Sequence, residues 1–329
     1  MASNSFGKAF RITTWGESHG EGIGCVIDGC PSKIAISEHE IQVALDRRSP
    51  GRRHTSSRKE VDRVQILSGI FGGKTTGAPI ALWIANTDVD STAYAKGQIR
   101  PGHAEYTYQK KYGHFDYRGG GRASARETAA RVAAGAIARK FLMHQWLTIS
   151  AWVSQVGEIE GGNEAGGQLE SEIFCFPKEF ETKVSHLLGT LVDKKDSVGG
   201  VVSCRISNVP PSLGEPIYDK IGARLGYGML SIPACKGIEF GQGFHAASMK
   251  GSEHNDKISA SGSLLTNNAG GMLGGITTGD DICFRVAFKP TPSNSGRYDP
   301  CVAIRAVPVV EAMATLTLAD FCCISGQCG

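Results

Sequence analysis

A nine-residue pattern that occurs twice constrains the fold of this chain more than any other feature of its sequence. Residues 72–80 read GGKTTGAPI and residues 274–282 read GGITTGDDI, so both match G-G-x-T-T-G-x-x-I, and each leads into a strand-like run. Gly-Thr turns are common at hairpins, so chance recurrence is one explanation. An ancestral duplication is the other, and it predicts a single domain over residues 1–329 with two pseudo-repeated halves.

Short runs rich in β-branched and aromatic residues predict strands. These runs are RITTW, GCVID, VQILSGIF, PIALWIA, GGVVSCRI, DICFRVAF and VAIRAVPVV. The best signalled helix begins at Ser37, where Ser37 and Glu40 form a capping box, and it ends near Arg48. Further helices are expected over residues 122–145, 179–192, 215–227 and 309–323. Because helices interrupt the strands irregularly, we expect an α+β sandwich rather than a doubly wound sheet.

Composition excludes several classes of protein. A chain of 329 residues with 41% hydrophobic residues can build a substantial core, but its net charge of +3 does not suit a general nucleic-acid binder. It has no apolar run of the length that spans a membrane, about 18 residues, and no signal-peptide core near its N-terminus. We therefore expect a cytoplasmic protein that binds neither membrane nor nucleic acid. Ten cysteines without a CxxC pair indicate reduced thiols in the core, and no metal site is evident.

Two arginine-rich stretches predict anion binding. The first, YRGGGRASARETAARVAAGA at residues 117–136, matches neither the dinucleotide fingerprint nor the P-loop. Its glycines lead into an expected helix, and the N-terminal amides with Arg118, Arg122 and Ser124 would bind a phosphate. A solvated helix start is the alternative. The second stretch, DRRSPGRRHTSSR at residues 46–58, fits a solvated face, a nucleic-acid patch or a site for a compact phosphate or carboxylate.

Two histidines and an aspartate are candidates for acid–base chemistry. His19 lies between glycines in WGESHGEG, and His103 follows a Pro-Gly turn in RPGHAEYTY. The unperturbed pKa of histidine is the one nearest neutrality, which suits proton transfer, although a structural role is the alternative for each. Asp299 precedes Pro300, so it either initiates a turn or accepts a proton beside the neighbouring arginines.

Three separated segments together resemble the chorismate synthase family. They are GESHG at 16–20, YRGGGRASARETA at 117–129 and RYDPCVAIRAVPVVEAM at 297–313, and RPGHAEYTY and DRRSPG are also similar. The resemblance covers nearly the whole chain and implies a β-α-β sandwich with an internal duplication. It also implies a lyase that converts 5-enolpyruvylshikimate 3-phosphate to chorismate and phosphate by 1,4-elimination, the last step of the shikimate pathway. Reduced FMN is the implied cofactor, NADPH a reductant that only some members use, and a homotetramer the implied assembly.

The resemblance implies a role for each matching residue. His19 resembles the general acid that protonates the leaving phosphate, and His103 is similar to the histidine that stabilises reduced flavin at N1. Asp299 resembles the carboxylate that helps N5 of the flavin act as a base. Arg48 and Arg53 look like the substrate-side arginines, in a site also assigned to NADPH. The implied FMN contacts are Arg122, Ala123, Ser124, Pro233, Ala234, Gly274, Lys289, Pro290, Thr291, Pro292, Ser293 and Arg297.

The chain also departs from the family pattern. Ala123 stands where serine is usual, and Tyr298 where histidine is common. Only seven residues separate Lys289 from Arg297, where bacterial members often have a longer excursion, and the tail after Asp320 is short. Lids commonly exclude water from such sites, so one alternative is a flavoprotein that binds its ligands without turnover. The second alternative is a nucleic-acid-binding module built on residues 46–58.

Overall fold

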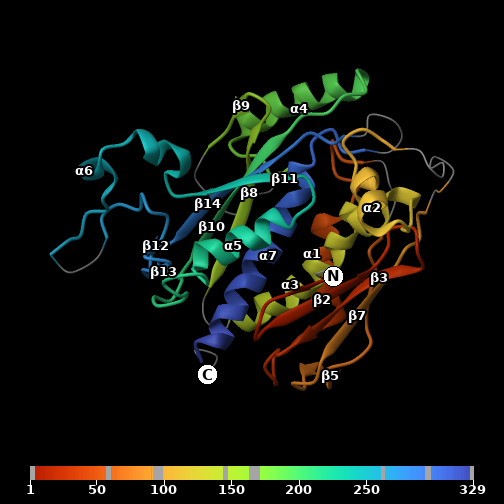
Figure 1. The fold of residues 1–329 in the computed structure, drawn as a ribbon, viewed down its shortest axis with the longest axis horizontal. Helices are drawn as coiled ribbons and strands as arrows, with labels where there is room; N and C mark the ends of the chain where they lie inside the picture. Colours follow the sequence, from red (N-terminus) through yellow and green to blue (C-terminus); the bar gives the residue numbers. More distant parts are fainter. Residues whose placement is uncertain are drawn as a thin grey trace.

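Two antiparallel sheets enclose a layer of helices (Figure 1). The structure is a computed structural model that describes residues 4–56, 61–89, 91, 99–143, 147–162, 171–260, 264–292 and 298–326. The first sheet has the strand order β1 (Ser5–Phe6), β2 (Arg11–Gly16), β3 (Gly22–Asp28), β7 (Ile80–Ala85), β4 (Val64–Ile66). The second has the order β11 (Cys235–Phe240), β14 (Ile282–Phe288), β10 (Gly200–Ser207), β8 (Thr148–Val156), β9 (Ile159–Glu160).

Four helices form the layer between the sheets: α1 (Glu38–Arg48), α3 (Thr128–Met143), α5 (Ile221–Leu230) and α7 (Ala303–Ile324). Helix α3 packs on β3 and β7 of the first sheet, and α7 packs on β8 and β10 of the second. The two helices meet closely at Gly135, where an added Cβ would lie 2.6 Å from the Cβ of Ala312. This arrangement is a β-α-β sandwich, so the predicted α+β class is confirmed.

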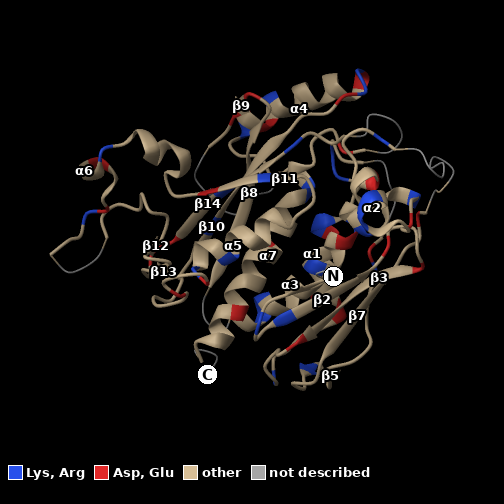
Figure 2. Cartoon of the chain, viewed as in Figure 1, with Lys and Arg blue, Asp and Glu red and all other residues tan. Residues whose placement is uncertain are grey.

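The remaining elements lie outside this layer. They are helices α2 (Glu105–Tyr112), α4 (Lys178–Asp193) and α6 (Gly251–His254), the hairpin strands β5 (Ile70–Phe71), β6 (Lys74–Thr75), β12 (Met272–Leu273) and β13 (Ile276–Thr277), and the 3-10 helices η1 (Arg118–Ala123), η2 (Ala125–Glu127) and η3 (Gly243–Ser248). Helices α2 and α4 carry both basic and acidic residues (Figure 2). Helix α7 has the length and mean hydropathy, 1.7, of a membrane span, but 89% of its apolar window is buried between the sheets.

The capping box that predicted α1 is present. The Ser37 side chain accepts a hydrogen bond from the Glu40 N–H at 3.3 Å, and Glu40 Oε2 accepts one from the Ser37 N–H at 2.9 Å. The helix ends at Arg48, as predicted. Among the cysteines, Cys25, Cys30, Cys175, Cys204 and Cys301 are buried free thiols, which confirms the expectation for these five.

Three predictions of secondary structure were wrong. The helix expected over about 215–227 begins only at Ile221. The run VAIRAVPVV, residues 302–310, forms the start of α7 and not a strand. Its β-branched residues favour a strand locally, but burial between two sheets outweighs a propensity difference of a few tenths of a kcal/mol per residue. Helix α3 begins at Thr128, six residues after the predicted start at 122, because three glycines and two 3-10 turns precede it. Strands β8 and β11 were not predicted.

The repeated nine-residue pattern forms equivalent structures. Each copy makes a small hairpin, β5–β6 or β12–β13, that precedes a central strand of its sheet. Thr75 Oγ1 donates to the carbonyl of Pro31 at 2.7 Å, and Thr277 Oγ1 donates to the carbonyl of Pro210 at 2.7 Å. Each hydroxyl also accepts the backbone N–H three residues after that proline. The division into two pseudo-repeated halves stays a prediction, and these matching contacts support it.

Candidate active site

The first of the three consecutive glycines, Gly119, packs against His19. Gly119, Gly120 and Gly121 have φ values of 58°, 87° and 52°, which glycine adopts without the cost that other residues incur. An added Cβ on Gly119 would lie 1.9 Å from Cε1 of His19, so no other residue fits there without moving the imidazole. The glycine run and the predicted acid therefore belong to one site. The interpretation of these glycines as the N-terminus of α3 was wrong, because that helix begins only at Thr128.

His19 lies in the turn between β2 and β3 and is 6% exposed. Ser18 Oγ lies 3.1 Å from its Nδ1 and 3.2 Å from the carbonyl oxygen of Gly119. The carboxylate of Asp116 is also near. Its pKa is lowered mainly by the hydrogen bond from Arg118 and to a smaller extent by the charge of His19. The imidazole is thus held on several sides by groups from two separate loops.

Arg122 lies at the boundary of two adjoining cavities. Its Nη2 donates to the carbonyl of Thr14 at 2.8 Å and its Nε to Asn4 Oδ1 at 3.2 Å. Its Nη1 is buried without a hydrogen-bond partner and lies 3.9 Å from a carboxylate oxygen of Glu127. The cavities measure about 250 and 440 Å³ and share Asn4, Thr14, Tyr108 and Arg122. A guanidinium with a spare donor at a cavity wall is suited to an anionic group.

The smaller cavity contains other residues expected to bind FMN. Ala123 and Pro233 line it, together with the cation of Arg131 and the ring of Tyr227. Ser124, the next residue in the predicted set, instead caps η2, since its Oγ accepts the Arg126 N–H at 3.3 Å.

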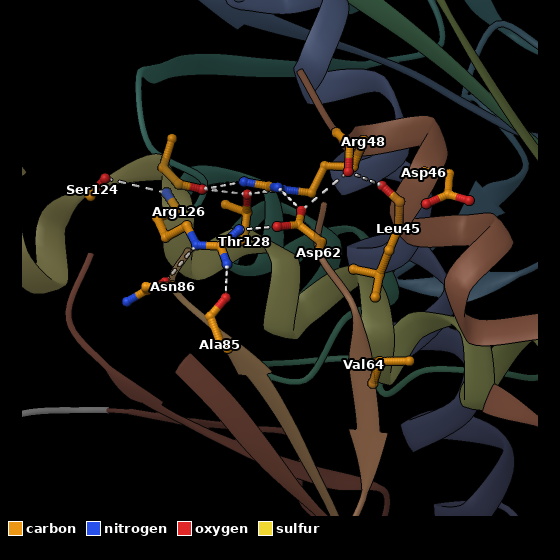
Figure 3. A network of polar contacts seen from close by, with 12 residues as sticks. Leu45, Asp46, Arg48, Asp62, Val64, Ala85, Asn86, Ser124, Arg126 and Thr128 are labelled. Carbon is orange, nitrogen blue, oxygen red and sulfur yellow. Dashed lines mark hydrogen bonds and ion pairs between the residues drawn. The ribbon is translucent and has the colours of Figure 1, made fainter. Parts of the chain in front are cut away.

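A buried ion network joins the end of α1 to the turns before α3 and includes one predicted residue, Arg48 (Figure 3). Arg48 Nη1 lies 2.7 Å from Asp62 Oδ2, and Arg126 Nη1 pairs with Asp62 Oδ1. Arg48 also donates to Thr128 Oγ1 at 3.0 Å and to the carbonyl of Ala125 at 3.1 Å. Burial alone would raise the pKa of Asp62, but the charges of Arg48 and Arg126 lower it overall.

Much of the 46–58 stretch is buried or engaged with the rest of the chain. Arg48 is 2% exposed, and Arg47 pairs with Glu311 at 2.6 Å. The guanidinium of Arg52 lies 4.8 Å from the ring centroid of Phe174. Arg53, the second predicted substrate arginine, is exposed. These contacts are unlike a solvated basic face that would track a nucleic-acid backbone.

Asp299 connects this stretch to the start of α7. Its Oδ1 accepts the Ser56 N–H at 2.8 Å, and its Oδ2 lies 3.0 Å from Nη1 of Arg305. Asp299 and Arg305 line a narrow cavity with Arg48 and Pro233. Because Pro233 lines both this cavity and the one beside Arg122, the predicted carboxylate and flavin contacts are neighbours.

His103 follows Gly102, which contacts Lys289 and Pro292 of the segment after β14. Its Nε2 is buried without a hydrogen-bond partner, and burial, then the charge of Arg100, lowers its pKa. Lys289 Nζ donates to the carbonyl of Gly102 at 3.0 Å, and Lys289 N donates to Ala234 at 3.0 Å. His103 and Lys289 are therefore both neighbours of Gly102.

The other members of that segment have separate contacts. Thr291 Oγ1 donates to the carbonyl of Asp299 at 2.8 Å, and Pro292 lies against Gly102. Pro290 lies near Gly199. Ser293 and Arg297 fall outside the described residues.

Gly274, another predicted FMN contact, does not line the cavity beside Arg122. It lies at the exposed end of the β12–β13 hairpin, and its neighbour Gly275 packs on Lys220 at the start of α5. The opposite end of α5 reaches Ser231, which lines the cavity beside Arg122. A helix of ten residues spans about 15 Å. Within one chain, Gly274 is therefore remote from the cavity.

Sequence reasoning missed several residues of this region: Ser56, Asp62, Arg126 and Arg305. Ser56 Oγ is buried without a partner, as are Arg52 Nε and His54 Nε2. Buried polar groups are normally hydrogen-bonded, so these three atoms are candidates for contact with a bound molecule or water. Arg305 could have been noticed from the sequence, because it lies six residues after Asp299 in the same segment, RYDPCVAIRAVPVVEAM. Among the described residues, no cluster of three possible metal ligands was found.

Three comparisons with known proteins agree. Residues 10–295 match the family model described as chorismate synthase. A curated chorismate synthase of Protochlamydia amoebophila (strain UWE25) is 49% identical over an alignment of 365 positions, which covers 100% of this chain and 99% of the relative. A solved structure titled as the crystal structure of chorismate synthase has a TM-score of 0.79 and 35% identity, over 96% of this chain and 92% of its own.

Proposed function

The chain belongs to the chorismate synthase family, and we propose that it binds reduced FMN in the cavities around Arg122 and Pro233. It is a carbon–oxygen lyase that forms chorismate, the final step of the shikimate pathway. The substrate is a phosphorylated small molecule, 5-enolpyruvylshikimate 3-phosphate. The observation that supports the site best is the packing of Gly119 on His19, because it places the family's glycine run and its acid together.

The residues around the cavities fit a flavin phosphate and ring. Arg122 offers an unused donor, Nη1, and lines the cavity with Arg131 and with Glu127, which pairs with Arg131 at 2.7 Å. The rings of Tyr108 and Tyr227 supply flat apolar surface. His103 offers a buried Nε2 without a partner. Bound reduced FMN supplies the electron-rich ring needed to break the substrate C–H bond.

Side chains of the protein are expected to protonate the departing phosphate and to stabilise its negative charge. His19 is in place to donate a proton to it, since the imidazole is held by Ser18 and Gly119. Arg48 and Arg126 both pair with the buried carboxylate of Asp62, so two guanidinium groups are fixed in this buried group. A positive charge fixed in a site that excludes water stabilises the negative charge that develops on a leaving group.

We further propose a cytoplasmic homotetramer with NADPH as an external reductant of the flavin. The position of Gly274 supports a role for neighbouring subunits. Since it lies about one ten-residue helix length away from the cavity of its own chain, it would reach a flavin only from another subunit.

An anaerobic assay tests the proposal. Protein, chemically reduced FMN and 5-enolpyruvylshikimate 3-phosphate are mixed, and chorismate absorbance and phosphate release are followed in parallel. Equal amounts of both products would establish the reaction with this cofactor. Binding of both ligands without product would favour a flavoprotein that lacks turnover. That second outcome would direct attention to the short connection between Lys289 and Arg297, where bacterial members of the family often have a longer excursion.

The contact between Gly119 and His19 yields a separate prediction. Gly119→Ala is expected to lower kcat by about 10²-fold, since displacement of a catalytic group by roughly 1 Å has that effect. Gly72→Ala is the matched control: the φ of Gly72 is 57°, close to the 58° of Gly119, but an added Cβ meets no atom within 4 Å. Equal kcat in the two variants would show that the methyl group does not act through the imidazole.

A further inference from the structure

Asp299 is held by two groups from different parts of the chain. One oxygen accepts the backbone N–H of Ser56 at 2.8 Å, and the other lies 3.0 Å from the Nη1 of Arg305. The carboxylate and the guanidinium are both largely buried, at 13% and 15% side-chain exposure. Because each oxygen has its own partner, rotation of the carboxylate about either side-chain torsion would break a contact.

Arg305 is itself fixed in position. It lies in the first turn of α7, whose start is buried between the sheets, and its Nε donates to the carbonyl of Arg48 at 3.4 Å. Arg48 is the last residue of α1, so the guanidinium also lies at a helix C-terminus, where positive charge is favourable. Burial raises the pKa of Asp62, and the charges of Arg48 and Arg126, followed by that of Arg305, outweigh it and lower the pKa.

The cavity lining connects this pair to the site. Arg305, Asp299, Arg48 and Pro233 surround the same narrow cavity. Three of these four residues match family positions for catalysis, substrate or flavin, and Arg305 is the one without an assigned role. Its guanidinium has protein acceptors on both sides, which suits a residue that orients another group rather than one that binds substrate.

We propose that Arg305 is a positioning residue that holds the Asp299 carboxylate toward the cavity shared with Pro233. This inference rests on the proposed function, since it assumes that Asp299 takes part in the elimination. The Ser56 N–H fixes one carboxylate oxygen and Arg305 the other, so removal of Arg305 leaves Asp299 in place but free to rotate. Loss of orientation lowers turnover more than it lowers substrate binding.

A double-mutant cycle tests the proposal. Arg305→Ala is expected to lower kcat about 10²-fold with KM within about threefold of the original value. In an Asp299→Asn background the same change is expected to lower kcat by less than about twofold, because the carboxylate it orients is already gone. Arg305→Lys, or guanidinium added to the Arg305→Ala variant, is expected to restore part of kcat. Losses that multiply in the double variant, or a rise in KM alone, would overturn the proposal.

A second measurement keeps the test independent of turnover. The same cycle is measured by urea unfolding, where Arg305→Ala and Asp299→Asn are expected to be less than additive because they remove the same ion pair. Arg11→Ala, which breaks an exposed pair with Asp28 at 3.0 Å, is the control. If the original protein makes no chorismate, the proposed function fails, while additive unfolding effects would overturn the Arg305 inference itself.

Discussion

Replacement of His19 by alanine is expected to lower kcat for chorismate formation by about 10² to 10⁴-fold, the usual contribution of a positioned acid. The imidazole is 6% exposed and is held between Ser18 Oγ, 3.1 Å from its Nδ1, and the backbone of Gly119. Proton transfer to the phosphate requires such a fixed donor. The measurement is single-turnover chorismate formation with chemically reduced FMN, which separates the chemical step from flavin reduction.

A measurement of FMN affinity shows whether the loss of kcat in His19→Ala is specific to the chemical step. His19→Ala is expected to bind FMN within a few-fold of the original affinity, because the residues expected to contact the flavin lie on other segments. Fluorescence titration of oxidised FMN measures this. His39→Ala is the matched control, since His39 lies on the exposed face of α1, and its kcat is expected to stay unchanged. Near-normal turnover in His19→Ala would remove the assigned role.

The parts of the fold that sequence reasoning predicted are those determined by local chemistry. The capping box of Ser37 and Glu40 and the two Gly-Gly hairpins depend on residues a few positions apart. The run VAIRAVPVV was misassigned because its conformation depends on what covers it. Its residues from Ala303 onward are buried in α7 between two sheets, with Pro308 inside the helix, and that environment is a property of the whole sandwich.

The residues of the candidate site also fall into two groups: those that a local motif identifies and those whose position depends on the whole fold. Motifs identified His19, His103 and Asp299, and the structure places Asp299 at a cavity, His19 against Gly119 and His103 next to Gly102, while their catalytic roles stay predictions. Motifs did not reveal Asp62, since a lone Asp before a strand is common on surfaces. Arg126 lies in the arginine-rich stretch, but its pairing with Asp62 could not be read from it. Their burial follows from α1, β4, β7 and α3 converging at one point, which no short segment encodes (Figure 3).

Gly274 shows a different limit. Resemblance assigned it to the flavin, yet the chain places it at a hairpin end beyond α5. A family motif records contacts made in the assembled enzyme and does not say which subunit supplies them. If our proposal for this residue is correct, the site is completed only by association of chains.

The buried network supplies the other large prediction, because Asp62 is 0% exposed and faces both Arg48 and Arg126. Asp62→Ala is expected to lower the free energy of unfolding by about 3–5 kcal/mol, since two buried cations lose the carboxylate that they share. Urea unfolding followed by circular dichroism measures this. Asp28→Ala is the control, as its pair with Arg11 at 3.0 Å is half exposed and such pairs contribute at most about 1 kcal/mol. Equal losses in the two variants would mean that solvent reaches the network and that Asp62 does not hold α1 and η2 together.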